Sequence, residues 1–215
     1  MKLFDLDGPL FQTMNTLTNL VVLNILFCIC CIPVVTIGAA STALHGCVQE
    51  LLDEKKEKGL IQRYFGKFRK EFGHSTSIWL FCLIVFGILF LYQKVVSVID
   101  GALGQSYQIL FYILCIIFWF GFQYLFPMQA RYGKKVGFTI KYAWLISAAA
   151  LPWSLAAMAS TGVLIYVSFF LNPDIFSTTV YLWLVAGFGV LSYITNIFYL
   201  KAFDKFAPIL GSHEE

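Results

Sequence analysis

Four amide side chains inside long apolar runs are the residues of this chain best suited to form a polar site. They are Asn19, Asn24, Gln123 and Asn196. An amide carries donors and an acceptor, so among apolar helices it can line a pocket or hydrogen-bond to a neighbouring helix. We treat the four residues as a candidate polar lining of a helical bundle, with interhelical hydrogen bonding as the alternative for each.

The cysteines and histidines do not form a pattern that predicts catalysis or metal binding. The chain has six cysteines: Cys28, Cys30, Cys31, Cys47, Cys82 and Cys115. No CxxC pair recurs at zinc-ligand spacing, and Cys28 and Cys31 share a helical face without a nearby histidine or carboxylate. His45 and His74 lie at the ends of apolar runs, and His213 lies in a polar tail. We expect no catalytic residue, no metal site and no cofactor.

The elements that must hold these residues are membrane helices. The chain is 59% hydrophobic and 13% charged, whereas a soluble domain has about 25% charged residues. A membrane-spanning helix needs about 20 predominantly apolar residues, and five runs reach that length without strand-like alternation. We predict an all-α integral membrane protein with a single membrane domain over residues 1–215. Its spans are 17–37, 78–99, 109–130, 143–171 and 180–200.

The basic residues predict the orientation of these spans. Thirteen of the 15 Lys and Arg residues lie in the first loop, in the third loop or after the fifth span, and only Lys2 and Lys94 lie elsewhere. Because basic residues are retained on the cytoplasmic side, this pattern places the N-terminus outside and the C-terminus in the cytoplasm. If Pro33 and Gly38 turned the first run into a re-entrant hairpin, Lys2 would also lie inside. We favour the full crossing because 21 consecutive residues lack an ionisable group apart from weakly acidic cysteine thiols.

Five residues are predicted to shape the helices rather than to carry chemistry. Pro33 has no N–H, so the first span should bend near its cytoplasmic end. Thr36 can donate to a carbonyl that is freed there, and Gly38 lets another backbone approach closely. Pro127 and Pro152 are expected to bend the third and fourth spans.

Small residues recur at a spacing of four in the fourth span. Ala143 with Ser147 and Ala156 with Ser160 are examples. Because small side chains let helix backbones approach closely, this span is predicted to be the most enclosed helix of the bundle.

The first loop is predicted to contain a cytoplasmic amphipathic helical segment over residues 43–72. Aromatic residues recur there at spacings of three and four, with cations between them, as in helices that lie at a membrane surface. The residues expected to contact lipid headgroups or a partner protein are Tyr64, Phe65, Lys67, Phe68, Arg69 and Phe72. Nucleic acid is not an expected partner, because the basic stretch is short and is flanked by membrane spans.

Several stretches of the chain resemble a known family. These are "GPLFQTMNTLTNLVVLNILFCICCIPVVTIGAASTAL", "YFGKFRKEFGHSTSIWL", "LFPMQARYG" and "LPWSL". Together they resemble the YesL-like family of small bacterial integral membrane proteins, from Gly8 to about Leu155. The resemblance implies association with carbohydrate ABC importers, whose genes neighbour those of the family, but it implies no functional residue.

This resemblance and the absence of a catalytic pattern lead to the expected function. We expect a non-enzymatic accessory or scaffold subunit of a bacterial carbohydrate-uptake system in the plasma membrane. The expected partners are the lipid bilayer and ABC importer permease subunits, and self-association is left open. The alternative is a small transporter or permease-like subunit with its own substrate path.

The predicted orientation can be tested with reporter fusions. A reporter fused after Glu215 should be cytoplasmic, and one inserted in "DGALGQS" should be external, because the cations flank the opposite ends of these spans. A tag at Met1 should be external. A cytoplasmic Met1 together with a cytoplasmic Glu215 would contradict five full crossings.

Overall fold

The computed structural model describes residues 9–53, 59–99, 101–169 and 176–211, and all regular structure within them is helical. Five helical stretches there are long and apolar enough to cross a membrane: Thr13–Cys30, Leu60–Val96, Gly101–Tyr132, Leu151–Phe169 and Thr178–Phe206. They indicate a multi-pass membrane protein and confirm the predicted all-α class. Lys55, Lys56 and Lys58 of the predicted cytoplasmic segment lie outside the described residues, as do residues 172–175 between the predicted fourth and fifth spans.

The helices follow one another through short connections. Their order is α1 (Pro9–Cys30), the 3₁₀ turn η1 (Val34–Thr36), α2 (Ile37–Leu52), α3 (Leu60–Val96), α4 (Gly101–Tyr132), α5 (Val136–Ala149), α6 (Leu151–Phe169), α7 (Phe176–Leu182), the π-helical turn η3 (Trp183–Gly187) and α8 (Phe188–Gly211).

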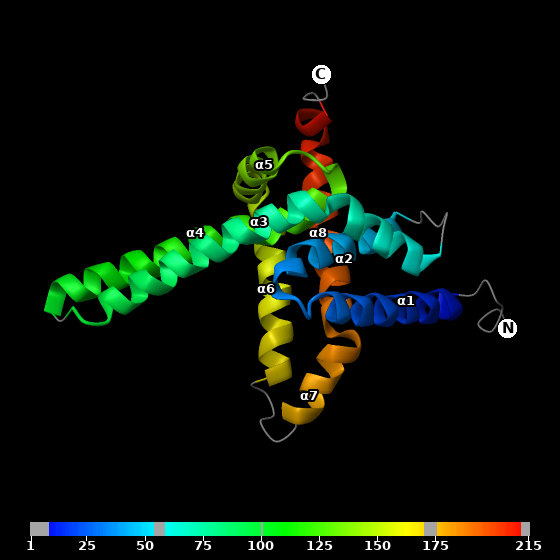
Figure 1. Cartoon of the computed structure of the whole chain (residues 1–215), viewed down its shortest axis with the longest axis horizontal. Coiled ribbons are helices and arrows are strands. Elements are labelled where there is room, and N and C mark those ends of the chain that lie inside the picture. The colour runs from blue at the N-terminus through cyan, green and yellow to red at the C-terminus, as the bar shows by residue number, and fades with distance from the viewer. Residues whose placement is uncertain (1–8, 54–58, 100, 170–175, 212–215) are drawn as a thin grey trace.

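The long helices do not form one parallel bundle. Figure 1 shows α3 and α4 as a long hairpin that extends away from the centre of the molecule, while α6 and α8 run crosswise to it. Ring stacking of Tyr92 on Phe111, with centroids 6.0 Å apart, joins the two helices of the hairpin near its tip. The simple bundle that the sequence suggested is therefore replaced by a hairpin and a crossing group of helices, which meet around α2.

Pro33 ends a helix instead of bending it. The first apolar helix stops at Cys30, and Pro33 adopts an extended backbone before η1. A residue that precedes proline avoids the helical region, which favours a stop at this place. The Thr36 hydroxyl donates to the carbonyl of Cys30 at 2.5 Å and to that of Pro33 at 2.7 Å. The predicted span 17–37 is therefore too long at its C-terminal end, and Thr36 bonds the last carbonyl of α1 rather than a carbonyl within a bent helix.

The segment 43–72 is not one amphipathic surface helix. Its first part belongs to α2, where ten of the sixteen residues are buried, and its last part is the beginning of α3. Small residues form much of the buried surface of α2, namely Gly38, Ala39, Ala40, Ala43, Gly46 and Cys47. Small side chains let several helices pack around α2. The apolar residues of α2 thus predicted a helix correctly but not its burial.

The predicted span 143–171 consists of two helices. Helix α5 ends at Ala149 and α6 begins at Leu151. Pro152 therefore lies in the first turn of α6, where its missing N–H costs no helical hydrogen bond. The Ser154 hydroxyl donates to the carbonyls of Ser147 and Ala150 and so satisfies the end of α5. The prediction that the fourth span is the most enclosed helix is wrong. In the most apolar 18 residues of α6 only 11% are buried, the smallest share among the five apolar stretches.

The close approach of α2 and α3 can be tested at Gly38. A Cβ atom on Gly38 would clash with the Ser75 carbonyl and lie 2.7 Å from Trp79 Cβ. Gly38→Ala should therefore destabilise the protein by about 1–3 kcal/mol, as overpacking does, and lower the melting temperature in detergent. Gly73→Ala in α3 is the matched control, because a Cβ there meets nothing within 4 Å. Equal melting temperatures for the two variants would contradict this packing.

Candidate functional site

A cavity of about 340 Å³ lies where α1, α2, α3, α4, α6 and α8 meet. Its walls are mainly apolar, and aromatic rings reach it from helices distant in sequence: Phe27, Trp79, Trp119, Phe122, Phe126 and Phe188. Trp79 donates its indole N–H to the Val34 carbonyl at 2.8 Å, which fixes that ring at the exit from α1. The size and the apolar walls are those of a small-molecule site.

His45 brings a polar group to the wall of this cavity. Its Nδ1 atom accepts a hydrogen bond from Asn196 Nδ2 at 2.7 Å, and the Ser192 hydroxyl lies 3.2 Å from the same nitrogen. Asn196 also donates to the Ser192 carbonyl, and its Oδ1 accepts from Gln49 Nε2 at 3.0 Å. The amide of Asn196 is buried and thereby fixes the His45 ring relative to α8.

The hydrogen-bond partners of His45 determine which of its ring nitrogens carries the proton. An amide N–H can only donate, so Nδ1 must accept and a neutral ring carries its proton on Nε2. Burial lowers the pKa of His45 from 6.5 to about 4, so the ring is neutral near pH 7. Among the described residues, no carboxylate is hydrogen-bonded to Nε2 of His45. The lone pair of Nδ1, which a general base would need, already accepts a hydrogen bond from Asn196. This geometry favours a hydrogen-bonding role for His45 over the activation of Ser192 as a nucleophile.

Gln123 is a second polar residue of the cavity wall. It lies one helical turn before Pro127 in α4, and Pro127 has no N–H to donate to the Gln123 carbonyl. The Gln123 Nε2 atom is buried and has no hydrogen-bond partner among the described residues. A buried donor without a partner costs about 1–3 kcal/mol, which a ligand oxygen in the cavity could recover.

Pro127 also links the cavity to the buried amides. Its carbonyl accepts from Gln49 Nε2 at 3.0 Å, so the amide nitrogen of Gln49 bridges α4 and Asn196 of α8. Pro127 thus remains inside a continuous α4, whereas Pro33 and Pro152 lie at helix starts or breaks.

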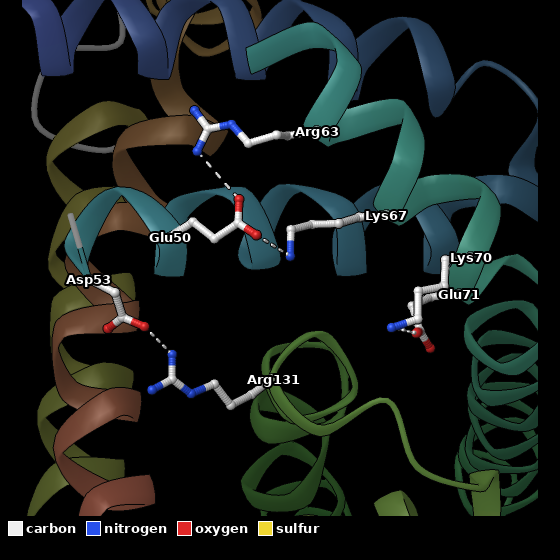
Figure 2. Close-up of polar contacts among 7 residues, drawn as sticks. All are labelled: Glu50, Asp53, Arg63, Lys67, Lys70, Glu71 and Arg131. Atoms are coloured by element: carbon white, nitrogen blue, oxygen red, sulfur yellow. Dashed lines mark hydrogen bonds and ion pairs between the residues drawn. The ribbon is translucent and has the colours of Figure 1, made fainter. Parts of the chain in front are cut away.

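The remaining residues of the "LFPMQARYG" stretch hold α4 against its neighbours. Gln129 is fully buried, donates to Glu71 of α3 at 2.8 Å and accepts from Thr139 of α5 at 2.5 Å. Gly133 has a φ of +58°, and its Cα region lies against the Glu71 carboxylate. Figure 2 shows the ion pair of Arg131 with Asp53 at the end of α2.

A second pair of ionic contacts joins α2 to the start of α3. Figure 2 shows Glu50 between Lys67, at 2.8 Å, and Arg63, at 3.4 Å. Tyr64, between those two cations in the sequence, is fully buried against α2. Lys67 and Tyr64 therefore face the protein, whereas Phe65, Arg69 and Phe72 are exposed and Phe68 is half-buried. Of the six predicted contact residues, only the exposed ones are free to meet lipid or a partner.

The four predicted amides separate in space. Gln123 lines the cavity and Asn196 lies behind His45, but Asn24 and Asn19 do not contribute to its wall. Asn24 is buried and binds the π-helical turn: its Nδ2 donates to the Trp183 and Leu184 carbonyls, and its Oδ1 accepts from the Gly189 N–H. Asn19 lies beside Gly59 and Gln62 instead. Interhelical hydrogen bonding, the alternative to a polar lining, thus describes Asn24 and Asn196.

Sequence reasoning missed His45, Gln49 and Ser192. Their spacing could have indicated these residues in the sequence. His45 and Gln49 are four residues apart in α2, and Ser192 and Asn196 are four residues apart in α8. Such pairs lie on one helical face. Among the described residues, no group of three or more His, Cys, Asp or Glu side chains could hold a metal ion.

Comparison with known proteins gives one partial match. Residues 20–92 match the model of a family described as "Protein of unknown function, DUF624". No curated protein and no solved structure matches the chain. The matched segment runs from Leu20 in α1 through α2 to Tyr92 in α3, so it includes His45, Gln49 and the Glu50 ion pairs.

The buried state of His45 predicts a loss of stability in acid. Because the folded-state pKa is below the ordinary value, the unfolded chain binds the proton more tightly between pH 6.5 and about 4. The contribution of neutral, buried His45 to the free energy of unfolding is fully present above pH 6.5. As the pH decreases from 6.5 toward 4, the free energy of unfolding should decrease by up to about 1.4 kcal/mol per pH unit. Melting temperatures in detergent should show this fall, and His45→Gln should reduce it. His74→Gln, at an exposed histidine of α3, is the control, and an equal pH profile for both variants would contradict the assignment.

Proposed function

We propose that this chain is a non-enzymatic accessory or scaffold subunit that associates with a carbohydrate ABC importer in a bacterial plasma membrane. The resemblance of the quoted stretches to the YesL-like family supports the choice of partner. The DUF624 match is consistent with a protein of this kind but adds no activity. In this proposal the N-terminus is outside and the C-terminus is cytoplasmic, as the distribution of cations predicts.

The exposed apolar surface of the α3–α4 hairpin is the observation that carries the proposal. Ile84, Ile88, Leu91 and Val95 follow one face of α3, and each is at least 59% exposed. Their spacing of four, three and four residues is that of a helix seam that packs against another helix. Lipid can cover such a seam, but an importer subunit with complementary helices can also pack against it.

The polar residues that contact several helices also have structural roles, as expected for a scaffold subunit. Gln129, Arg131 and Gly133 pack or pair within the protein, and the hydrogen bonds of His45 favour a structural role over activation of Ser192. The second candidate, a small permease-like subunit, is favoured by one observation, the cavity at the helix junction.

Copurification and flux measurements separate the two candidates. A tagged full-length chain extracted in a mild detergent should recover importer subunits in stoichiometric amounts. Substitution of Ile84, Ile88 and Leu91 by alanine should reduce this recovery several-fold, because the seam loses its packing side chains. Substitution of Leu155, Val163 and Val167 by alanine, at exposed positions of α6, is the matched control and should leave recovery unchanged.

Two results would contradict the accessory function. One is the absence of importer subunits from the preparation of the unaltered chain. The other is saturable flux of a sugar into liposomes that contain the isolated chain, which would support the permease-like alternative.

A further inference from the structure

We infer that the cavity at the helix junction is a binding site for an uncharged lipophilic molecule with a carbonyl oxygen, which accepts hydrogen bonds from His45 and Gln123. This inference does not depend on the proposed function, because an importer accessory and a permease could each contain such a site. It assigns a ligand class to a cavity that no comparison describes.

The size and walls of the cavity define the body of the ligand. About 340 Å³ is within the range of sites that enclose small organic molecules. Trp119 and Phe122 lie at a stacking angle with centroids 5.8 Å apart, and Trp79 lies 6.4 Å from Phe126. These aromatic side chains in the wall favour an apolar chain or a flat ring over a sugar, whose many hydroxyl groups would lack partners there.

Two side-chain N–H donors define the polar group of the ligand. The Nδ1 atom of His45 already accepts from Asn196, so the Nε2–H of the neutral ring is the available donor. Gln123 supplies the second donor, because its Nε2 is buried without a partner beside the same cavity and its terminal torsion can turn at low cost. Thr161 and Thr195 also line the cavity, but their hydroxyls donate to carbonyls of their own helices. A carbonyl oxygen, which only accepts, is the complement of these two donors.

The electrostatics exclude a charged ligand. His45 and Tyr199 are the ionisable side chains among the described residues of the cavity wall, and neither provides a counter-charge near pH 7 while His45 is neutral. An ion placed there would lose its hydration without gaining a partner. A membrane protein can obtain uncharged carbonyl compounds from two sources, namely acyl esters of the bilayer and free lipophilic quinones.

Matched probes with and without carbonyl groups test the site. The full-length protein is purified in a detergent that has no carbonyl group, and binding is followed by tryptophan fluorescence and by thermal stabilisation. The quinone arm compares 2-methyl-1,4-naphthoquinone with 2-methylnaphthalene. The ester arm compares dioctanoylglycerol with the corresponding dioctyl ether of glycerol. If the naphthoquinone binds more tightly than dioctanoylglycerol, the natural ligand is a free quinone. If dioctanoylglycerol binds more tightly, it is an acyl ester of the bilayer.

Variants distinguish the site from general partitioning. At least one carbonyl probe should bind about tenfold more tightly than its carbonyl-free partner. Gln123→Leu should weaken that probe about three- to tenfold, as the loss of a buried hydrogen bond does, and should leave the carbonyl-free probe unchanged. Gln62→Leu, at an exposed position of α3, is the matched control and should have no effect. Thr161→Phe should fill the cavity and weaken both members of the pair.

Three results would overturn the inference. They are equal affinity for probes with and without carbonyl groups, equal effects of Gln123→Leu and Gln62→Leu, and undiminished binding in a Thr161→Phe protein that retains its melting temperature. If Thr161→Phe fails to fold, the comparison of Gln123→Leu with Gln62→Leu still decides, because both replacements conserve side-chain volume approximately.

Discussion

The close contact of α2 with α3 is the constraint on which the rest of the structure depends. At Gly38 the two backbones approach so closely that a methyl group would clash with the Ser75 carbonyl. Thr42 and Ser75 form a buried hydrogen bond of 2.8 Å one turn later, and Glu50 pairs with Lys67 beyond it. These contacts fix the short α2 along the first half of α3. The other face of α2 can then present His45 and Gln49 to α4 and α8.

Buried amides determine which helices lie beside one another. Gln49 joins α2 to α4 and α8, Gln129 joins α4 to α3 and α5, and Asn24 joins α1 to the turn before α8. Each such bond contributes only about 1 kcal/mol net, but a buried amide left without partners costs more. Alternative packings of these apolar helices would leave several amides unpaired. The amides therefore select one arrangement among many that bury similar apolar area.

The sequence predicted the apolar helices well and their packing poorly. Long apolar runs identify membrane helices because the bilayer sets their length, and that information is local. The burial of α2 and the break before Leu151 depend on contacts with distant helices. Ala, Gly and Ser in α2 are compatible with a surface helix or a central one, and only the facing Ser75 and Trp79 decide between them. For the same reason Gln123 and Asn196 could be named from the sequence, while His45 could not.

The cavity follows from how the residues around α2 differ in size. The face of α2 toward α3 has glycine and alanine and packs without space, whereas the face with Ser41, Leu44 and His45 meets large rings from α3 and α4. Rigid rings cannot fill the irregular volume that remains beside α6 and α8, so the space persists. An entirely apolar cavity can remain empty at a modest cost in lost dispersion contacts. A donor such as Gln123 Nε2 without a partner adds a further cost at the same place. Occupation by a molecule with a carbonyl oxygen removes both costs at once, which is why the polarity of this wall matters more for the ligand than the cavity's volume.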